Sequence, residues 1–230
     1  MTILLNNHLS NDELARDFET NGIVRLFDFL QPESANELSR FLHSDINYDN
    51  AFYLEGSNRQ ASDEDIAKLP PQTRQQLYRD IYKIAAKGQG FLYGRHKVEN
   101  DSAALLVEAL NAMNSQSTLD VIKNITKNEK ITHADGQATR YRVGDFLTRH
   151  LDDIPGETRQ IAYVLGMSEN WHPDWGGLLQ FFEADGTTTN SWSPVYNSLT
   201  LFDVSKIHSV TSIAPFAEKS RYSITGWYRI

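Results

Sequence analysis

The spacing of apolar residues changes near residue 131, and this change limits the possible folds more than any other feature of the sequence. Before it, apolar residues recur at helical spacing, as Leu77, Ile81 and Ile84 do. After it they alternate with polar residues, and all four Trp and eight of the thirteen Gly lie there. Helices followed by short strands in a chain of 230 residues predict an α+β fold with a mainly β core.

Helices are expected to dominate the first 130 residues. Ser10 and Glu13 form a capping-box pattern that predicts a helix ending near Gly22, and Pro32 suits the first turn of a second helix. The polar stretch 44–63 is expected to be a surface loop, and its residues 48–62 are a candidate cover for a substrate. The remaining expectations in this part are a strand at 23–26 and helices at 73–87, 103–113 and 119–125.

Short runs of β-branched and aromatic residues follow residue 131, and Gly, Pro, Asp or Asn separate them. This pattern predicts strands joined by turns. The expected strands are 137–141, 146–149, 161–165, 178–182, 198–202 and 222–228. Such strands after helices predict a jelly roll buttressed by N-terminal α-helices. No linker is evident, so 1–230 is expected to be one domain, with 1–130 as helical support and 131–230 as the β core.

Composition excludes several classes of protein. The chain has no cysteine, so any metal must be held by His and carboxylate groups. It has 22 Lys+Arg against 30 Asp+Glu, a net charge of −8, which argues against nucleic-acid binding. It has no apolar run of the roughly 20 residues that a membrane span needs and no basic stretch at its start. A cytoplasmic monomer or homodimer without membrane contact is expected.

Three His-x-Asp triplets begin at His133, His150 and His172. On an extended strand, residues i and i+2 point to the same side, so both side chains of a triplet can bind one ion. A second His from a distant strand would complete the two-His-one-carboxylate set that is typical of non-haem Fe(II) oxygenases. The His133 triplet lies at an entry turn and the His172 triplet in a Trp-, Pro- and Gly-rich loop, which favours a structural role for both.

The His150 triplet has the best context for a metal site. His150 ends a strand-like run and is followed by Asp152, and His208, 58 residues later, is the only histidine after residue 172. Arg221 and Ser223 open the last expected strand. A guanidinium fork can bind a carboxylate through two hydrogen bonds, and a Ser hydroxyl adds a donor, so this set suits a metal with a dicarboxylate. For Arg221 alone, a surface ion pair is the alternative.

The motifs QATRYRVGDFLTRHLD at 137–152 and RYSITGWY at 221–228 carry a family resemblance, together with 171–181 and 215–216. They resemble the prolyl 4-hydroxylase branch of the Fe(II)/2-oxoglutarate dioxygenases. Within it the chain is most similar to the subgroup around the ribosomal-protein prolyl hydroxylases and their bacterial relatives. The resemblance covers about 90–230 well, and it implies a double-stranded β-helix.

The resemblance also implies the cofactors and their ligands. Iron is expected on His150, Asp152 and His208, and the distal carboxylate of the cosubstrate 2-oxoglutarate on Arg221. Tyr141 matches a tyrosine that commonly touches the cosubstrate in the family, and its alternative role is a packed strand aromatic. Ascorbate is a further candidate. No catalytic residue is expected beyond the metal ligands, because the cofactor supplies the chemistry.

One departure from the family concerns the pocket. Many prolyl hydroxylases have a second tyrosine where this chain has Gly166. Tyr163 has the opposite strand parity, so it is not an obvious replacement. The apolar wall around the iron is expected to come from residues whose alternative role is core packing, namely Val164, Leu178, Phe181, Leu201 and Trp227.

The implied activity is hydroxylation of a C–H bond, with O₂ consumed and succinate and CO₂ released. A prolyl residue in a protein or peptide is the first expectation, and the net charge of −8 would complement a basic peptide. A free amino acid or another small metabolite is the alternative within the enzymes. A non-catalytic, cupin-like metal- or ligand-binding module is the alternative from another class.

Overall fold

A computed structural model describes residues 3–6 and 12–230 of the chain. Ser10, which carries the predicted helix cap, lies outside these residues. The predicted helices are present within a few residues of their expected bounds, whereas α3 was not predicted. Pro32 and Pro71 each occupy the first turn of a helix, where a missing N–H costs no hydrogen bond. The helices are α1 (Asp12–Asn21), α2 (Pro32–Ser44), α3 (Asp63–Lys68), α4 (Pro71–Ala85), α5 (Ala104–Met113) and α6 (Gln116–Thr126), with the short 3₁₀ helix η1 (Pro173–Trp175).

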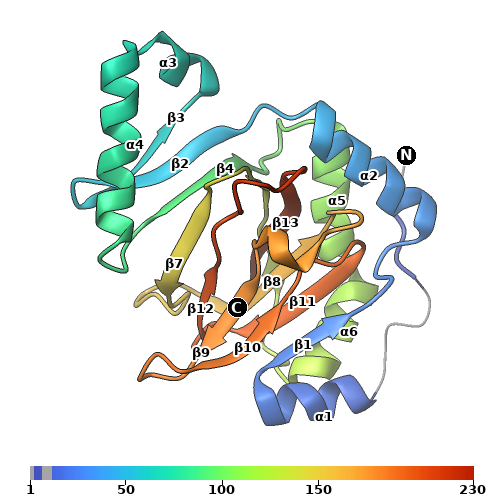
Figure 1. The fold of residues 1–230 in the computed structure, drawn as a ribbon. Coiled ribbons are helices and arrows are strands. Elements are labelled where there is room, and N and C mark those ends of the chain that lie inside the picture. Colours follow the sequence, from blue (N-terminus) through green and yellow to red (C-terminus); the bar gives the residue numbers. More distant parts are fainter. Residues whose placement is uncertain (1–2, 7–11) are drawn as a thin grey trace.

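The strands form one strongly curled sheet in which every pair is antiparallel (Figure 1). The strand order is β1-β11-β8-β13-β6-β4-β7-β12-β9-β10, while β2 pairs with β3 and β4, and β5 pairs with β13. The strands are β1 (Ile23–Leu26), β2 (Asp49–Leu54), β3 (Ser57–Ala61), β4 (Phe91–Lys97), β5 (His133–Ala134), β6 (Gln137–Tyr141), β7 (Phe146–His150), β8 (Arg159–Gly166), β9 (Leu179–Phe182), β10 (Thr188–Trp192), β11 (Ser198–Asp203), β12 (Ile207–Val210) and β13 (Arg221–Arg229).

Helices cover one face of this sheet. Figure 1 shows α2, α5 and α6 along one side of the curled strands, while α3, α4 and the β2–β3 hairpin extend from the other side. Leu38 and Leu42 of α2 and Ile122 of α6 are fully buried in the cluster beneath the helices. Full burial of one such side chain is worth about 1.5–3 kcal/mol, so this face anchors the sheet firmly.

Strand alternation separates the helix-covered core from the interior of the curl. In β8, Ile161, Tyr163 and Leu165 belong to the cluster under the helices, whereas Ala162 and Val164 belong to a second cluster inside the curl. Successive side chains of a strand point to opposite faces, so one strand serves both layers. The predicted double-stranded β-helix buttressed by N-terminal helices is confirmed.

The expectation of a loop at 44–63 is wrong, because this stretch contains the β2–β3 hairpin. Ala51 and Phe52 of β2 are buried and pair with β4, a strand that the sequence analysis did not predict. The hairpin is polar on its outer strand, so its composition resembles that of a loop. Its extended conformation comes from pairing with β4. Among the described helices, none is both long and apolar enough to span a bilayer.

Candidate metal centre

The two histidines of the predicted triad lie opposite each other on neighbouring strands. His150 is the last residue of β7 and His208 lies in β12, and these two residues are direct partners in the β7–β12 pair. Directly opposed residues project from the same face of a sheet, which brings the imidazoles together. Their ring centroids are 4.1 Å apart. Strand pairing thus joins two side chains that are remote in sequence.

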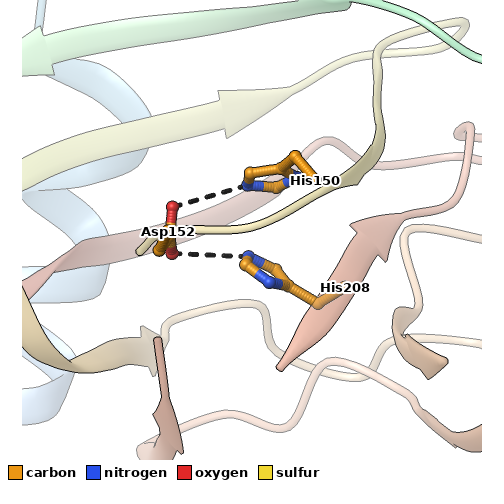
Figure 2. A group of neighbouring side chains, drawn as sticks. All are labelled: His150, Asp152 and His208. Atoms are coloured by element: carbon orange, nitrogen blue, oxygen red, sulfur yellow. Dashed lines mark ion pairs between the residues drawn. The ribbon is translucent and has the colours of Figure 1, made fainter. Parts of the chain in front are cut away.

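Asp152 completes the group two residues after His150. Its carboxylate lies beside the two rings and turns one oxygen to each, with Oδ1 3.6 Å from His150 Nε2 and Oδ2 3.5 Å from His208 Nε2 (Figure 2). The backbone N–H of Asp152 donates to the carbonyl of Val204 at 3.2 Å, which holds this bend against the chain between β11 and β12. Within residues 3–6 and 12–230 this is the only cluster of three candidate metal ligands, and its ligand atoms lie within 4.8 Å of one another.

Backbone carbonyls fix the orientation of both imidazoles. His150 Nδ1 lies 3.0 Å from the carbonyl oxygen of Thr148, and His208 Nδ1 lies 2.9 Å from that of Lys206. A carbonyl oxygen only accepts, so Nδ1 carries the proton and donates, and Nε2 keeps its lone pair. Contacts of this kind orient metal-binding histidines and raise their basicity. Two imidazole nitrogens and one carboxylate therefore face a common point, and this donor set fits Fe(II).

The charge states of the triad also suit a cation. Burial by itself raises the pKa of Asp152, but the proximity of the His150 and His208 imidazoles outweighs it and holds that pKa below its ordinary value. Burial, together with the neighbouring His150, lowers the pKa of His208 to about 4. At neutral pH the group therefore offers an ionised carboxylate and a neutral His208 ring, which are the forms that bind metal.

The other two His-x-Asp triplets lie outside this cluster. His133 is exposed in the two-residue strand β5, where its ring contacts the hydroxyl of Thr132. His172 precedes η1, accepts a hydrogen bond from the backbone of Asp174, and its side chain is 60% exposed. The neighbouring Trp171 and Trp175 pack edge to face, so the expected loop with a packed Trp pair is present.

Arg221 lies at the inner side of the same cavity, whose volume is about 520 Å³. It is the first residue of β13, pairs with Tyr141 of β6, and has its guanidinium carbon 5.2 Å from the centre of the Tyr141 ring. Only 4% of Arg221 is exposed, and no carboxylate in the described part of the chain lies within 4.0 Å of it. A buried guanidinium without a counter-charge is costly, so it is suited to receive an anion.

Tyr141 and Ser223, the other predicted cosubstrate contacts, differ in their position. Tyr141 lines the cavity and stacks on Tyr93 with ring centroids 5.1 Å apart, so the geometry keeps both of its expected roles open. Ser223 is not among the cavity-lining residues, and its hydroxyl lies 2.7 Å from that of Thr139. Thr139 and Thr225 line the cavity on this side instead.

The position of the missing family tyrosine is filled by backbone. A Cβ atom on Gly166 would collide with the carbonyl oxygen of Val195, so the chain before β11 occupies the space that a larger side chain needs. Tyr163 does not replace it, because its hydroxyl donates to the carbonyl of Asp135 at 2.8 Å. A tyrosine at position 166 would therefore not fit in this fold without a shift of the Val195 backbone.

The apolar residues that line the cavity differ in part from those expected around the iron. Val164 and Trp227 line the cavity as expected, but Leu178, Phe181 and Leu201 do not. Leu179 and Phe202, the neighbours of Leu178 and Leu201, line the cavity instead. Phe181 faces the same side as Leu179 and packs against Phe202 and His208 without reaching the lining. Adjacent strand residues face opposite sides, so an error of one position in the assumed parity moves a side chain from the cavity to the core behind it.

Three arginines at the cavity were not singled out from the sequence. Arg159, at the start of β8, has its guanidinium carbon 3.7 Å from the centre of the Trp227 ring and Nη1 3.9 Å from Asp152 Oδ1. Arg95 of β4 and Arg149 of β7 are also among the lining residues, but the guanidinium of Arg149 lies over the Phe182 ring, 5.5 Å from its centre and outside the lining. Each lies in a stretch that reads as an ordinary exposed strand or turn, so only the curl of the sheet brings them together.

Residues 136–229 match the family model of the 2OG-Fe(II) oxygenase superfamily. This span contains all three residues of the His-Asp-His cluster as well as Arg221. The family resemblance inferred from the motifs is therefore confirmed, and the cluster suits the Fe(II) and 2-oxoglutarate of that family.

A curated relative and two solved structures agree with this match. The prolyl 3-hydroxylase OGFOD1 of Mus musculus is 33% identical over 101 residues, which are 41% of this chain and only 18% of that protein. A prolyl-4-hydroxylase of Pseudomonas putida has the same fold, with a TM-score of 0.63, 21% identity, and coverage of 94% of this chain and 97% of that one. A Trichoplax adhaerens prolyl hydroxylase, solved with a peptide of hypoxia inducible factor, gives a TM-score of 0.63, 18% identity, and coverage of 95% and 88%.

Proposed function

Since residues 136–229 match the family model of the 2OG-Fe(II) oxygenase superfamily, we propose that this chain is an Fe(II)- and 2-oxoglutarate-dependent dioxygenase that hydroxylates a C–H bond. A prolyl residue of a protein or peptide is its first candidate substrate. The observation that carries the proposal is the convergence of two free Nε2 atoms and one ionised carboxylate beside a buried arginine that has no counter-charge. When bound, Fe(II) and 2-oxoglutarate supply the oxidising chemistry, and the protein positions the groups.

In this proposal the residues of the chain have distinct tasks. His150, Asp152 and His208 hold the metal, and Arg221 binds the distal carboxylate of 2-oxoglutarate through its two-pronged guanidinium. Tyr141 adds a hydroxyl next to that site. The apolar side chains that line the cavity exclude water from the reacting C–H bond, and they are Val164, Leu179, Phe202 and Val210.

Prolyl hydroxylation is supported by the relatives, whose names describe prolyl hydroxylases. The cavity itself is open enough for a peptide segment or a small molecule, with Tyr53 and Asn58 of the β2–β3 hairpin at its lining. A free amino acid or another small metabolite therefore remains the second candidate. A non-catalytic cupin-like module is disfavoured, because a protein without turnover has no need of an unpaired buried arginine beside a complete ligand set.

Metal binding and turnover are tested separately. Mn(II) titrated into the metal-free protein without oxygen should bind at one site, and 2-oxoglutarate should bind to that complex. With Fe(II) and O₂, succinate should form when the correct substrate is present, and mass spectrometry should detect a product 16 mass units heavier. Proline-containing peptides and free amino acids are screened in parallel.

The outcomes of this screen separate the candidates. Turnover on free amino acids with none on any peptide would replace the prolyl substrate by the small-molecule alternative. Binding of Mn(II) and 2-oxoglutarate without succinate formation on any substrate would favour the non-catalytic module. His150→Ala serves as the variant that should lose metal, and His172→Ala is its matched control, since His172 belongs to the rejected triplet.

A further inference from the structure

A small cavity adjoins the main cavity next to Arg221. Val164, Leu179 and Arg221 line both spaces, so the small one is a side pocket of the large one. Its volume is about 10 Å³, which is room for roughly one water-sized group. The side pocket is therefore too small for a second ligand, but one end of a ligand in the main cavity can reach it.

Arg25 of β1 places its guanidinium at the wall of this side pocket. Arg25 and Thr200 are direct partners in the β1–β11 pair, and Arg25 Nε donates to the Thr200 hydroxyl at 3.0 Å. Its Nη1 donates to the carbonyl of Ser193 at 3.0 Å, and its guanidinium carbon lies 4.8 Å from the centre of the Trp192 ring. Arg25, Thr200 and Trp192 all line the side pocket. These contacts fix the guanidinium itself, and not only the stem of the side chain, at this wall.

The side pocket thus has two arginines and no counter-charge. No carboxylate in the described part of the chain lies within 4.0 Å of Arg25 or Arg221. Burial, together with the charge of Arg221, lowers the pKa of Arg25 to about 10, and burial also lowers the pKa of Arg221. Both side chains remain charged at neutral pH, so they repel each other. An anion close to both would remove this cost.

Gly166 lies at the same side pocket, at the position where many prolyl hydroxylases have a tyrosine. The carbonyl oxygen of Val195 leaves no room for that side chain here. Gly166 and Thr200 lie on the neighbouring strands β8 and β11. This wall therefore has no tyrosine hydroxyl from position 166, and its charged donor is Arg25.

The distal carboxylate of 2-oxoglutarate is an anion of the required kind. It is assigned above to Arg221, which lines both the main cavity and the side pocket. A carboxylate has two oxygens with about four acceptor positions, and the fork of one guanidinium fills only two of them. The Thr200 hydroxyl accepts a hydrogen bond from Arg25 and still has its own proton to donate. Donors for the remaining positions are thus present at the side pocket.

We propose that Arg25 is a second cosubstrate-binding residue, which holds the distal carboxylate of 2-oxoglutarate together with Arg221. Thr200 is a positioning residue that orients the guanidinium of Arg25. This proposal rests on the proposed function. The alternative is a purely structural role, in which Arg25 only connects β1 to β11 and to the chain that precedes β11.

A matched pair of ligands separates the two roles of Arg25. 2-Oxoglutarate is compared with 2-oxopentanoate, which has a methyl group in place of the distal carboxylate. Both dissociation constants are measured by calorimetry on the protein loaded with Mn(II) without oxygen. Arg25→Gln should weaken 2-oxoglutarate binding roughly 10-fold, as expected for loss of one charge-assisted contact, and should leave 2-oxopentanoate binding nearly unchanged. A purely structural role would weaken both ligands alike.

Further variants connect the effect to the charge and to Thr200. Arg25→Lys keeps the charge but not the fork, so its affinity for 2-oxoglutarate should lie between those of the wild type and Arg25→Gln. Thr200→Val should also weaken 2-oxoglutarate binding, but it should add little to Arg25→Gln, because both changes disturb one contact. Arg79→Gln is the matched control, since Arg79 is an exposed arginine of α4 whose loss changes the net charge equally. It should alter neither affinity.

Mn(II) binding serves as the check on folding. Arg25 does not belong to the metal cluster, so every variant should keep the Mn(II) affinity of the wild type. If Arg25→Gln does not fold, the comparison of the two ligands is made with Arg25→Lys, which keeps a cation at the same place.

The outcomes distinguish this inference from the proposed function. A wild type that binds no 2-oxoglutarate overturns the proposed dioxygenase, and this inference with it. A wild type that binds 2-oxoglutarate, with an Arg25→Gln variant of equal affinity, overturns this inference alone. The same holds if Arg25→Gln weakens both ligands to the same extent, or if Arg79→Gln weakens 2-oxoglutarate binding as much as Arg25→Gln does.

Discussion

Replacing Arg221 by methionine should have opposite effects on cosubstrate binding and on the stability of the unliganded protein. Methionine keeps much of the length and the apolar stem while removing the guanidinium. A charge-assisted hydrogen bond contributes about 1.5–3 kcal/mol, so Arg221→Met should weaken 2-oxoglutarate binding about 10–150-fold. The buried cation has no acidic partner within the described chain, only the Tyr141 ring at 5.2 Å. Its removal should therefore stabilise the unliganded fold.

The magnitude of the stability change follows from two opposing contributions. Replacing buried charges by well-packed apolar groups stabilises proteins by about 1–4 kcal/mol. Loss of the contact with Tyr141 offsets this by about 0.5–2 kcal/mol. The midpoints of these two ranges give a net gain of about 1 kcal/mol, which for a chain of this size raises Tm by roughly 2–4 °C.

The assay combines thermal unfolding with calorimetry on the Mn(II)-loaded protein without oxygen. With 2-oxoglutarate at 100 times its wild-type Kd, ligand binding stabilises the wild type by about 2.7 kcal/mol. The weaker affinity of the variant reduces this to about 0.3–1.4 kcal/mol. Arg221→Lys keeps the charge but not the fork and should fall between the two. Arg79→Met, on the surface of α4, should change neither quantity.

Two results would refute this reasoning. If Arg221→Met binds 2-oxoglutarate within twofold of the wild type, Arg221 does not receive the distal carboxylate. If the unliganded variant is less stable than the wild type by more than about 2 kcal/mol, the guanidinium of Arg221 stabilises the fold through contacts within the protein, and it is not an unoccupied anion-binding group.

Three further predictions test the site and its surroundings. His150→Ala should lose most Mn(II) binding in an anaerobic titration while His172→Ala keeps it, and the reverse would show that the wrong triplet was chosen. Burial raises the pKa of Asp145 to about 7, so the folded state binds more protons than the unfolded state between about pH 4 and 7, and stability should fall as pH rises through that window. The slope is at most about 1.4 kcal/mol per pH unit, and Asp145→Asn should flatten it in denaturant titrations at several pH values. Gly166→Ala should cost about 1–3 kcal/mol in the same measurement, because the new methyl group meets the Val195 carbonyl, and an unchanged midpoint would mean that this segment moves easily.

Local features of the sequence were sufficient to predict most of the helices and the type of ligands at the candidate metal site. The signals that predict helix α2 are Pro32 at its start and the spacing of Leu38 and Leu42, and all of them lie within a few helical turns of one another. The helix begins at Pro32, as predicted. The pair His150 and Asp152 needs only the two-residue periodicity of an extended chain to share one side. The absence of cysteine restricted the ligands to imidazole and carboxylate before any fold was known.

The composition of the cavity depended on strand pairing, which the sequence does not display. Leu179 and Phe202 line it in place of Leu178 and Leu201, because parity depends on where each strand begins and bends. The β2–β3 hairpin looked like a loop because its outer strand is polar, and pairing with β4 makes it a strand. Both errors concern interactions between residues far apart in the sequence.

The same reason explains why the arginines of the cavity were missed. Arg95 and Arg149 lie on strands β4 and β7, and in sequence each is an ordinary polar residue of a short strand. The composition predicted an acidic molecule, and it is one on average. Which arginines lie at the cavity depends on how β4, β7, β8 and β13 curl around one space. The amino-acid sequence by itself identified the residues proposed to hold the metal, through the spacing of His150 and Asp152 and the motifs around them. Only the tertiary structure decided which side chains line the pocket, because they come from strands that meet only when the sheet closes.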